Sequence, residues 1–172
     1  QKKLINYDKS KGVKLTGTGL KAAMQIIRKH RIWEMFLQEK LGYTWEEVHE
    51  IAEQLEHVHE ESLADRLDSF LGHPQFDPHG EAIPKPDGNM PDVTYKTLYD
   101  VEMGKTYRVV SVKDTSRSFL QYLRMLNIRI GTELKVLDKI SFDDSLSILI
   151  GETGKATISK KFAVSIYVDG VA

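Results

Sequence analysis

Apolar residues recur at helical spacing through the first part of the chain. Residues 20–40 contain neither Gly nor Pro, and their apolar seam predicts one long helix that Gly42 ends. A second helix is predicted from Thr44, a favourable N-cap with Glu47 three residues later, to about His59. The segment ESLADRLDSFL predicts a third helix. Together these patterns predict a helical domain.

The segments that flank the helices have different patterns. KKLINYDKSKGVKLT alternates polar and apolar residues around a turn-rich centre, which predicts a two-stranded hairpin with a basic tip within residues 1–19. The helical domain then occupies residues 20–73. All five prolines lie within HPQFDPHGEAIPKPDGNMP, which predicts an irregular linker over residues 74–97.

Short β-rich runs dominate the rest of the chain, residues 98–172. The runs are KTYRVVSVKD, TELKVLDKI, SLSILIGE and AVSIYVD, with one helical insert, SFLQYLRMLN. Such short strands separated by turns predict a small β-barrel of the SH3 type. The expected fold class is therefore α+β.

Composition limits the classes of protein that this chain can represent. With 41% hydrophobic residues it favours folded domains over disorder, and the absence of cysteine excludes disulfides and thiolate chemistry. No apolar run of membrane-spanning length and no signal peptide is visible, so we expect a cytoplasmic protein with no membrane partner. The first residue is Gln rather than Met, which suggests that upstream sequence is missing.

Charge is polarised along the chain. Residues 1–40 carry ten Lys and Arg against three acidic residues, whereas residues 41–92 carry two against thirteen. A basic beginning suits nucleic acid or another polyanion, and an acidic middle suits a metal ion or a basic partner. Composition does not choose between these partners.

The acidic segment EVHEIAEQLEHV holds four carboxylates and two histidines without a Lys or Arg. On a helix, His49, Glu53, Glu56 and His57 fall within an arc of roughly 100°. A solvated polar face is one interpretation. However, like charges at this spacing destabilise a helix by a few tenths of a kcal/mol per pair, and solvated faces usually mix charges of both signs.

The preceding helix places two polar residues, His30 and Glu34, inside its apolar seam. Burying such groups costs several kcal/mol unless they find partners, although a lone buried histidine is more often a hydrogen-bonded core residue than a ligand. A divalent cation would neutralise the carboxylates and join the two helices. Carboxylate and imidazole donors suit Mn²⁺, Fe²⁺, Co²⁺ or Zn²⁺.

Three segments, RKHRIWEMFLQEKLG, WEEVHEIAEQLEHV and DRLDSFLGHPQFDPHGEAIP, closely resemble the metal-dependent repressors of the diphtheria toxin repressor (DtxR/MntR) family. The resemblance covers nearly the whole chain. It implies a DNA-binding transcriptional repressor that controls metal-ion homeostasis, with a winged helix-turn-helix, a helical dimerisation and metal-binding domain and a C-terminal FeoA-like SH3 domain. Residues 1–19 would be the wing of a truncated winged-helix domain, whose recognition helix is not in this chain.

The resemblance also implies two sets of metal ligands. The primary site would contain Glu53, Glu56 and His57, with its remaining ligands on a helix outside this chain. The second site would contain His30, Glu34 and His49. Several family members complete the second site from the SH3 domain, but the acid and amide used by the iron-dependent branch are replaced here by Ser116 and Phe119, so Asp114 is the expected substitute.

The resemblance suggests which metal is bound. The iron-dependent branch has Cys where this chain has Glu53, and the manganese-responsive branch has Glu there. Mn²⁺ is therefore the first choice and Fe²⁺ the alternative, while Zn²⁺ or Co²⁺ could bind in vitro. A hard carboxylate donor agrees with Mn²⁺.

The resemblance also implies two macromolecular partners, operator DNA through the full-length protein and a second copy of the chain. Predicted phosphate contacts on the hairpin are Lys9, Lys11 and Lys14. The predicted homodimer seam consists of Trp33, Phe36, Leu63, Leu67 and Phe70. An ordinary basic hairpin and plain core packing are the respective alternatives.

Enzymatic motifs are not apparent. No nucleophile with a paired base and no Gly-rich phosphate loop is seen, and GETGK lacks the spacing of a P-loop. We therefore expect neither an enzyme nor a small-molecule substrate. The alternatives to a repressor are a metal-dependent hydrolase, because Glu and His around a metal can activate water, and a DNA-free metal-binding adaptor module.

Overall fold

The computed structural model describes residues 3–10, 12–58 and 60–171. They divide into two compact units, one made of Gln1–Asp77 with Ala82–Asp92 and the other of Pro78–Glu81 with Val93–Ala172. The first unit is mainly helical and the second is built around a sheet, so the predicted α+β class is confirmed. Among the described residues, none of the helices combines the length and apolar character that a membrane span requires.

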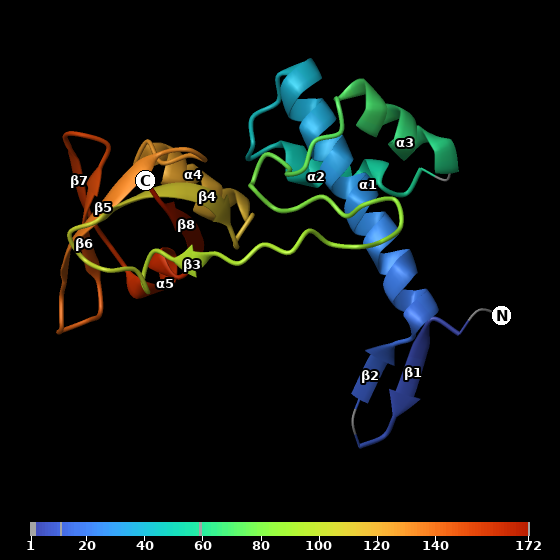
Figure 1. Cartoon of the computed structure of the whole chain (residues 1–172), viewed down its shortest axis with the longest axis horizontal. Coiled ribbons are helices and arrows are strands. Elements are labelled where there is room, and N and C mark those ends of the chain that lie inside the picture. The colour runs from blue at the N-terminus through green and yellow to red at the C-terminus, as the bar shows by residue number, and fades with distance from the viewer. Residues whose placement is uncertain (1–2, 11, 59, 172) are drawn as a thin grey trace. The chain divides into compact units, whose positions relative to one another are not determined.

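The first unit begins with the predicted hairpin and continues into three helices (Figure 1). Strands β1 (Ile5–Asp8) and β2 (Gly12–Leu15) pair antiparallel, with Ile5 opposite Leu15. Helices α1 (Gly17–Leu41), α2 (Val48–Leu55) and α3 (Glu61–Phe70) follow. Helices α2 and α3 both pack against α1, the longest helix of the unit.

Helix α1 begins three residues earlier than its apolar seam predicts. The side chain of Thr16 caps it by accepting a hydrogen bond from the amide of Gly19. At the other end Gly42 adopts a left-handed conformation with φ of 72°; its amide donates to the carbonyl oxygen of Gln38, and the amide of Tyr43 donates to that of Leu37. Glycine takes this conformation without steric cost, so the predicted end of the helix is correct.

Helix α2 is shorter than predicted. The carboxylate of Glu47 accepts hydrogen bonds from the amide and hydroxyl of Thr44, as the sequence suggests, but the residues between them form a turn and the helix begins only at Val48. It ends at Leu55, with Glu56 as C-cap and no basic residue in its last turn. Acidic groups there oppose the helix dipole, so the prediction that the helix continues beyond Leu55 was wrong; His59, its predicted end, lies outside the described residues.

Two apolar clusters hold the three helices together. Buried Ile32 and Ala64 pack with Ile83 of the Pro-rich segment, and partly buried Met35, Leu67 and Leu71 surround them. The second cluster joins α1 to α2 and consists of Leu37, Val48 and Ala52, with Trp33, Ile51 and Leu55 against it. The Pro-rich segment therefore contributes to the core of the helical unit.

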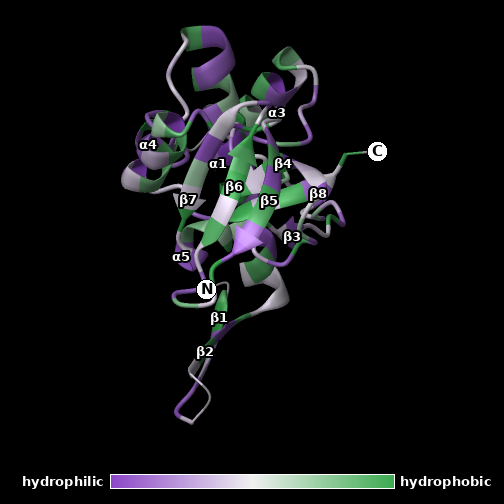
Figure 2. Ribbon diagram, turned by 90° about the vertical axis from the view of Figure 1, so that its left-hand side faces the viewer, coloured by the Kyte–Doolittle hydropathy of each residue, from purple (hydrophilic) through white to green (hydrophobic). Residues whose placement is uncertain are grey.

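The second unit contains one antiparallel sheet of six strands in the order β3-β8-β4-β5-β6-β7. Its elements are β3 (Lys96–Thr97), β4 (Thr106–Val112), α4 (Arg117–Met125), β5 (Glu133–Lys139), β6 (Leu146–Ile150), β7 (Gly154–Ile158), α5 (Lys160–Ala163) and β8 (Ile166–Gly170). Strands β5 and β6 are rich in hydrophobic residues (Figure 2), and alternate side chains along them, Leu134 and Val136 on β5 and Leu146 and Ile148 on β6, are buried. Within the described residues β3 and β7 remain edge strands, so the predicted SH3-like domain is present without a closed barrel.

Candidate metal centre

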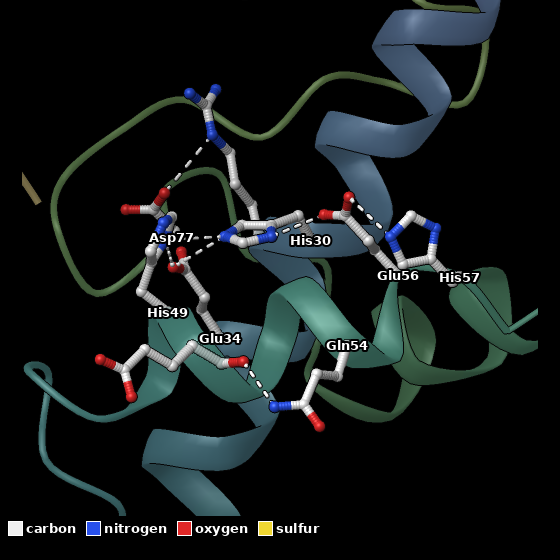
Figure 3. A network of polar contacts seen from close by, with 9 residues as sticks. His30, Glu34, His49, Gln54, Glu56, His57 and Asp77 are labelled. Carbon is white, nitrogen blue, oxygen red and sulfur yellow. Dashed lines mark hydrogen bonds and ion pairs between the residues drawn. The ribbon is translucent and has the colours of Figure 1, made fainter.

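His30 lies at the centre of a polar cluster between α1 and α2 (Figure 3). Its Nδ1 lies 2.7 Å from Oε2 of Glu56. On the other side of the ring, Nε2 lies 3.0 Å from Oε1 of Glu34 and 3.0 Å from Nδ1 of His49. Both nitrogens of one imidazole therefore face side chains that the resemblance predicts to be metal ligands.

Glu34 is the most deeply buried member of this cluster, with a side chain only 2% exposed. Its Oε1 lies 3.0 Å from the ring of His30 and 3.1 Å from Nδ1 of His49. A buried carboxylate is costly unless it is paired, and here two imidazoles flank it. The three groups offer ligand atoms within 4.8 Å of one another, and nitrogen and carboxylate donors fit a divalent transition metal.

The environment of His30 favours its protonated form in the absence of metal. Burial by itself lowers the pKa of the imidazole, but hydrogen bonds and charge interactions with Glu34 and Glu56 outweigh that effect. The pKa of His30 is therefore raised above its ordinary value. Positive charge on the ring is therefore favoured by the two neighbouring carboxylates.

The three residues predicted for the primary site do not form a comparable cluster. Glu53 is exposed on α2, and the side chain of His57 is 74% exposed with its Nε2 at 3.9 Å from Oε1 of Glu56. Glu56 turns its other oxygen toward His30 (Figure 3). Of the three residues only Glu53 lies within α2, because Glu56 is the C-cap of the helix and His57 follows it.

The remaining predicted metal and DNA residues lie elsewhere. Asp114 belongs to the sheet unit, where its Oδ1 accepts a hydrogen bond from the amide of Ser116 at 2.9 Å. Lys9 and Lys14 are exposed on the hairpin, at its turn and on β2 respectively. Lys11 lies outside the described residues.

The predicted dimer residues differ in what they contact. Trp33 packs against the cluster that joins α1 to α2, and Leu67 packs against the cluster around Ile32. Leu63 is half-buried. Phe36 and Phe70 lie with their ring centroids 6.3 Å apart, and the side chain of Phe70 remains 64% exposed. Phe70 is therefore the member of the set with most apolar surface left to bury.

One buried charged residue was missed by the sequence reasoning. Arg28 is only 2% exposed, and its guanidinium contacts Asp65 at 3.0 Å and Asp68 at 2.9 Å, both on α3. Asp68 also accepts from Nδ1 of His73 at 3.0 Å. The available signal was the spacing of the two aspartates, which places them on one face of α3.

Comparison with known proteins identifies the family. Residues 16–85 match the family described as iron dependent repressor, metal binding and dimerisation domain, and residues 96–170 match the FeoA domain. A solved manganese-dependent transcriptional repressor in complex with manganese superposes with a TM-score of 0.86 at 35% identity, covering 98% of this chain and 78% of that one. The chain belongs to the DtxR/MntR family. The resemblance inferred from the three sequence segments is confirmed.

Two curated relatives are similar to this chain over only part of their own length. The iron-dependent repressor IdeR of Mycobacterium leprae is 32% identical over 114 residues, which cover 62% of this chain and 50% of that protein. A probable metal transport system membrane protein of Chlamydia trachomatis is 42% identical over 71 residues, 41% of this chain and 16% of that protein. The chain thus spans half or less of these relatives.

Membership in the DtxR/MntR family bears on the class of activity. The proteins of this family are transcriptional repressors rather than enzymes, so the expectation of a non-enzymatic protein is confirmed and the hydrolase alternative is not favoured. Residues 16–85 correspond to the part of the family that binds metal and dimerises. The cluster around His30 lies within that segment.

Proposed function

We propose that this chain is the metal-sensing and dimerisation part of a cytoplasmic transcriptional repressor that controls metal-ion homeostasis. The observation that carries the proposal is the position of His30, whose ring lies within hydrogen-bonding distance of Glu56, Glu34 and His49. A polar cluster of this kind between two helices is costly without a cation. Family membership adds that the matching segment of other members binds metal.

In this proposal His30, Glu34 and His49 hold the second metal ion, and Asp114 of the sheet unit completes its coordination. Glu53, Glu56 and His57 hold the primary ion together with ligands from outside this chain. Mn²⁺ is the preferred metal because Glu53 offers a hard carboxylate, and a related solved structure is named as a complex with manganese. Fe²⁺ is the alternative, since the relative from Mycobacterium leprae is named as iron-dependent.

A bound divalent ion would supply positive charge at the buried carboxylate of Glu34. His30 and Glu34 belong to α1 and His49 belongs to α2. Ligands from both helices at one ion would fix one helix against the other. Any ligand that prefers this fixed arrangement stabilises it by the difference in affinity between the two states. A hundredfold preference corresponds to about 2.7 kcal/mol, which is sufficient for a switch.

Operator DNA and a second copy of the chain are the proposed partners. Lys9, Lys11 and Lys14 would contact phosphates, which position a protein on DNA without reading its sequence. Homodimerisation would bury Phe36 and Phe70 along with the outward surfaces of Trp33, Leu63 and Leu67. Two-fold symmetry would then set the spacing of the operator half-sites.

Calorimetric titration with Mn²⁺ tests the proposal. We expect the His30→Ala and Glu56→Ala variants to lose one binding event or to bind roughly a hundredfold more weakly, because each removes a donor from the cluster. His73→Ala is the matched control, since its imidazole pairs with Asp68 outside the cluster. Unchanged stoichiometry and affinity in both cluster variants would contradict the ligand assignment.

A further inference from the structure

The hairpin joins α1 through a single residue, Thr16, which lies between the end of β2 and the start of the helix. Its backbone amide donates to the carbonyl oxygen of Leu4 at 3.0 Å, directly before β1. Its hydroxyl donates to the carbonyl oxygen of Lys3 at 2.8 Å and accepts from the amide of Gly19 at 3.0 Å. Thr16 therefore ties both ends of the hairpin to the first turn of α1.

Gly19 occupies the point of closest approach between the hairpin base and the helix. A Cβ atom at this position would lie 1.9 Å from the carbonyl oxygen of Leu4 and 3.3 Å from Cδ2 of Leu15. Gly19 has ordinary helical backbone geometry and is buried, so space rather than conformation requires the missing side chain. Gly17, two residues earlier, has nothing within 4 Å of the equivalent position.

We propose that Thr16 and Gly19 are positioning residues that fix the hairpin lysines at one angle to α1, the helix that carries His30 and Glu34. The hairpin and the metal-bearing helix then move as one body, with no hinge between them. The inference rests on the proposed function for its consequence at DNA, but the mechanical link itself stands on the hydrogen bonds and the close approach.

Because the hairpin is long, a small change in its angle to α1 displaces its tip by a large distance. The hairpin extends about five residues beyond the clamp, or roughly 17 Å at the rise of a β-strand. A tilt of about 10° at its base would displace the tip by about 3 Å, more than a hydrogen bond to a phosphate tolerates. Over the thirteen residues from Gly17 to His30, α1 advances about 20 Å as a continuous helix.

The first test measures backbone mobility in this chain by ¹⁵N relaxation. In the wild type, β1 and β2 should show the order parameters of rigid backbone, about 0.85, matching α1. Gly19→Ala and Thr16→Val should lower the hairpin values toward about 0.6 while leaving α1 unchanged. Gly17→Ala and Thr16→Ser are the controls and should behave as wild type. Rigid hairpins in both test variants would overturn the clamp.

The second test measures DNA binding by the native-length protein saturated with Mn²⁺, at several salt concentrations. Gly19→Ala should bind DNA about tenfold more weakly, because Lys9 and Lys14 are misplaced. The slope of log K against log salt concentration should become shallower by the amount that corresponds to about two phosphate contacts. Adding Lys9→Ala and Lys14→Ala to this variant should cause little further loss. Calorimetric affinity for Mn²⁺ should stay at the wild-type value, which separates mispositioning from unfolding.

The outcomes separate this inference from the proposed function. Wild-type DNA affinity and salt dependence in Gly19→Ala would sink the inference while leaving the repressor assignment intact. Absence of metal-dependent DNA binding in the wild type would sink the proposed function. In that case the relaxation experiment still decides whether Thr16 and Gly19 clamp the hairpin.

Discussion

The imidazole of His30 has an acidic neighbour at each of its two ring nitrogens, Glu56 at Nδ1 and Glu34 at Nε2. In the metal-free chain this raises the pKa of His30 even though burial alone would lower it. A group whose pKa is raised on folding stabilises the native state below its unfolded pKa, and that stabilisation is lost as the pH rises through the folded pKa.

We therefore predict a pH-dependent stability for the chelator-treated chain. The free energy of unfolding of the wild type should exceed that of His30→Gln most clearly below about pH 6.5, the ordinary pKa of histidine, and the difference should shrink as the pH rises through the raised pKa of His30. Urea unfolding at a series of pH values measures it. His57→Gln is the control, because that side chain is 74% exposed. A difference that grows with pH would contradict the assignment.

The sequence pattern drew attention to His30 and Glu34, which lie together in the structure, but not to Arg28, for a physical reason. Polar residues in the middle of an apolar seam are conspicuous because burial without partners is costly. An arginine at the border of the seam is normally expected to extend its charged end into solvent. Only the approach of α3, with Asp65 and Asp68, turns Arg28 into a buried ion-pair partner.

At the scale of elements, Arg28 joins α1 to α3 through ion pairs with Asp65 and Asp68. We predict that Arg28→Met lowers the free energy of unfolding by about 3 kcal/mol, because it leaves Asp68 without its guanidinium partner in a largely buried position. Arg66→Met, an exposed change on α3, should alter stability by less than about 0.5 kcal/mol. Equal urea midpoints for both variants would show that the pair contributes no net stability.

Helix α2 is shorter than the periodic pattern of apolar residues predicts. Helical spacing of apolar residues continues to Val58, which predicted a longer helix, yet α2 ends at Leu55. Spacing alone does not include the energy of placing carboxylates at the negative end of the helix dipole. Glu56 is the C-cap at this end, and its carboxylate lies 2.7 Å from Nδ1 of His30.

At the scale of the whole molecule, the prediction concerns association of two chains. Phe70→Ser should weaken the homodimer by about 2 kcal/mol, a roughly thirtyfold increase in its dissociation constant, because the exposed ring loses its burial in the partner. Sedimentation analysis over a range of protein concentrations measures this. Phe142→Ser removes a ring that is 96% exposed in the sheet unit and should leave association unchanged. Equal effects of both changes on the dissociation constant would contradict the placement of Phe70 in the homodimer interface.

The sequence by itself determined the order of the elements, the two-part division into helices and sheet, the family and the positions of the histidines and glutamates proposed to bind metal. These follow from local periodicity, caps such as Gly42, and residue types, all of which are readable along the chain. Tertiary structure alone decided which side chains meet. His30 and Glu56 are 26 residues apart and Arg28 and Asp68 are 40 apart, and their contacts exist only because packing of apolar faces brings α2 and α3 onto α1.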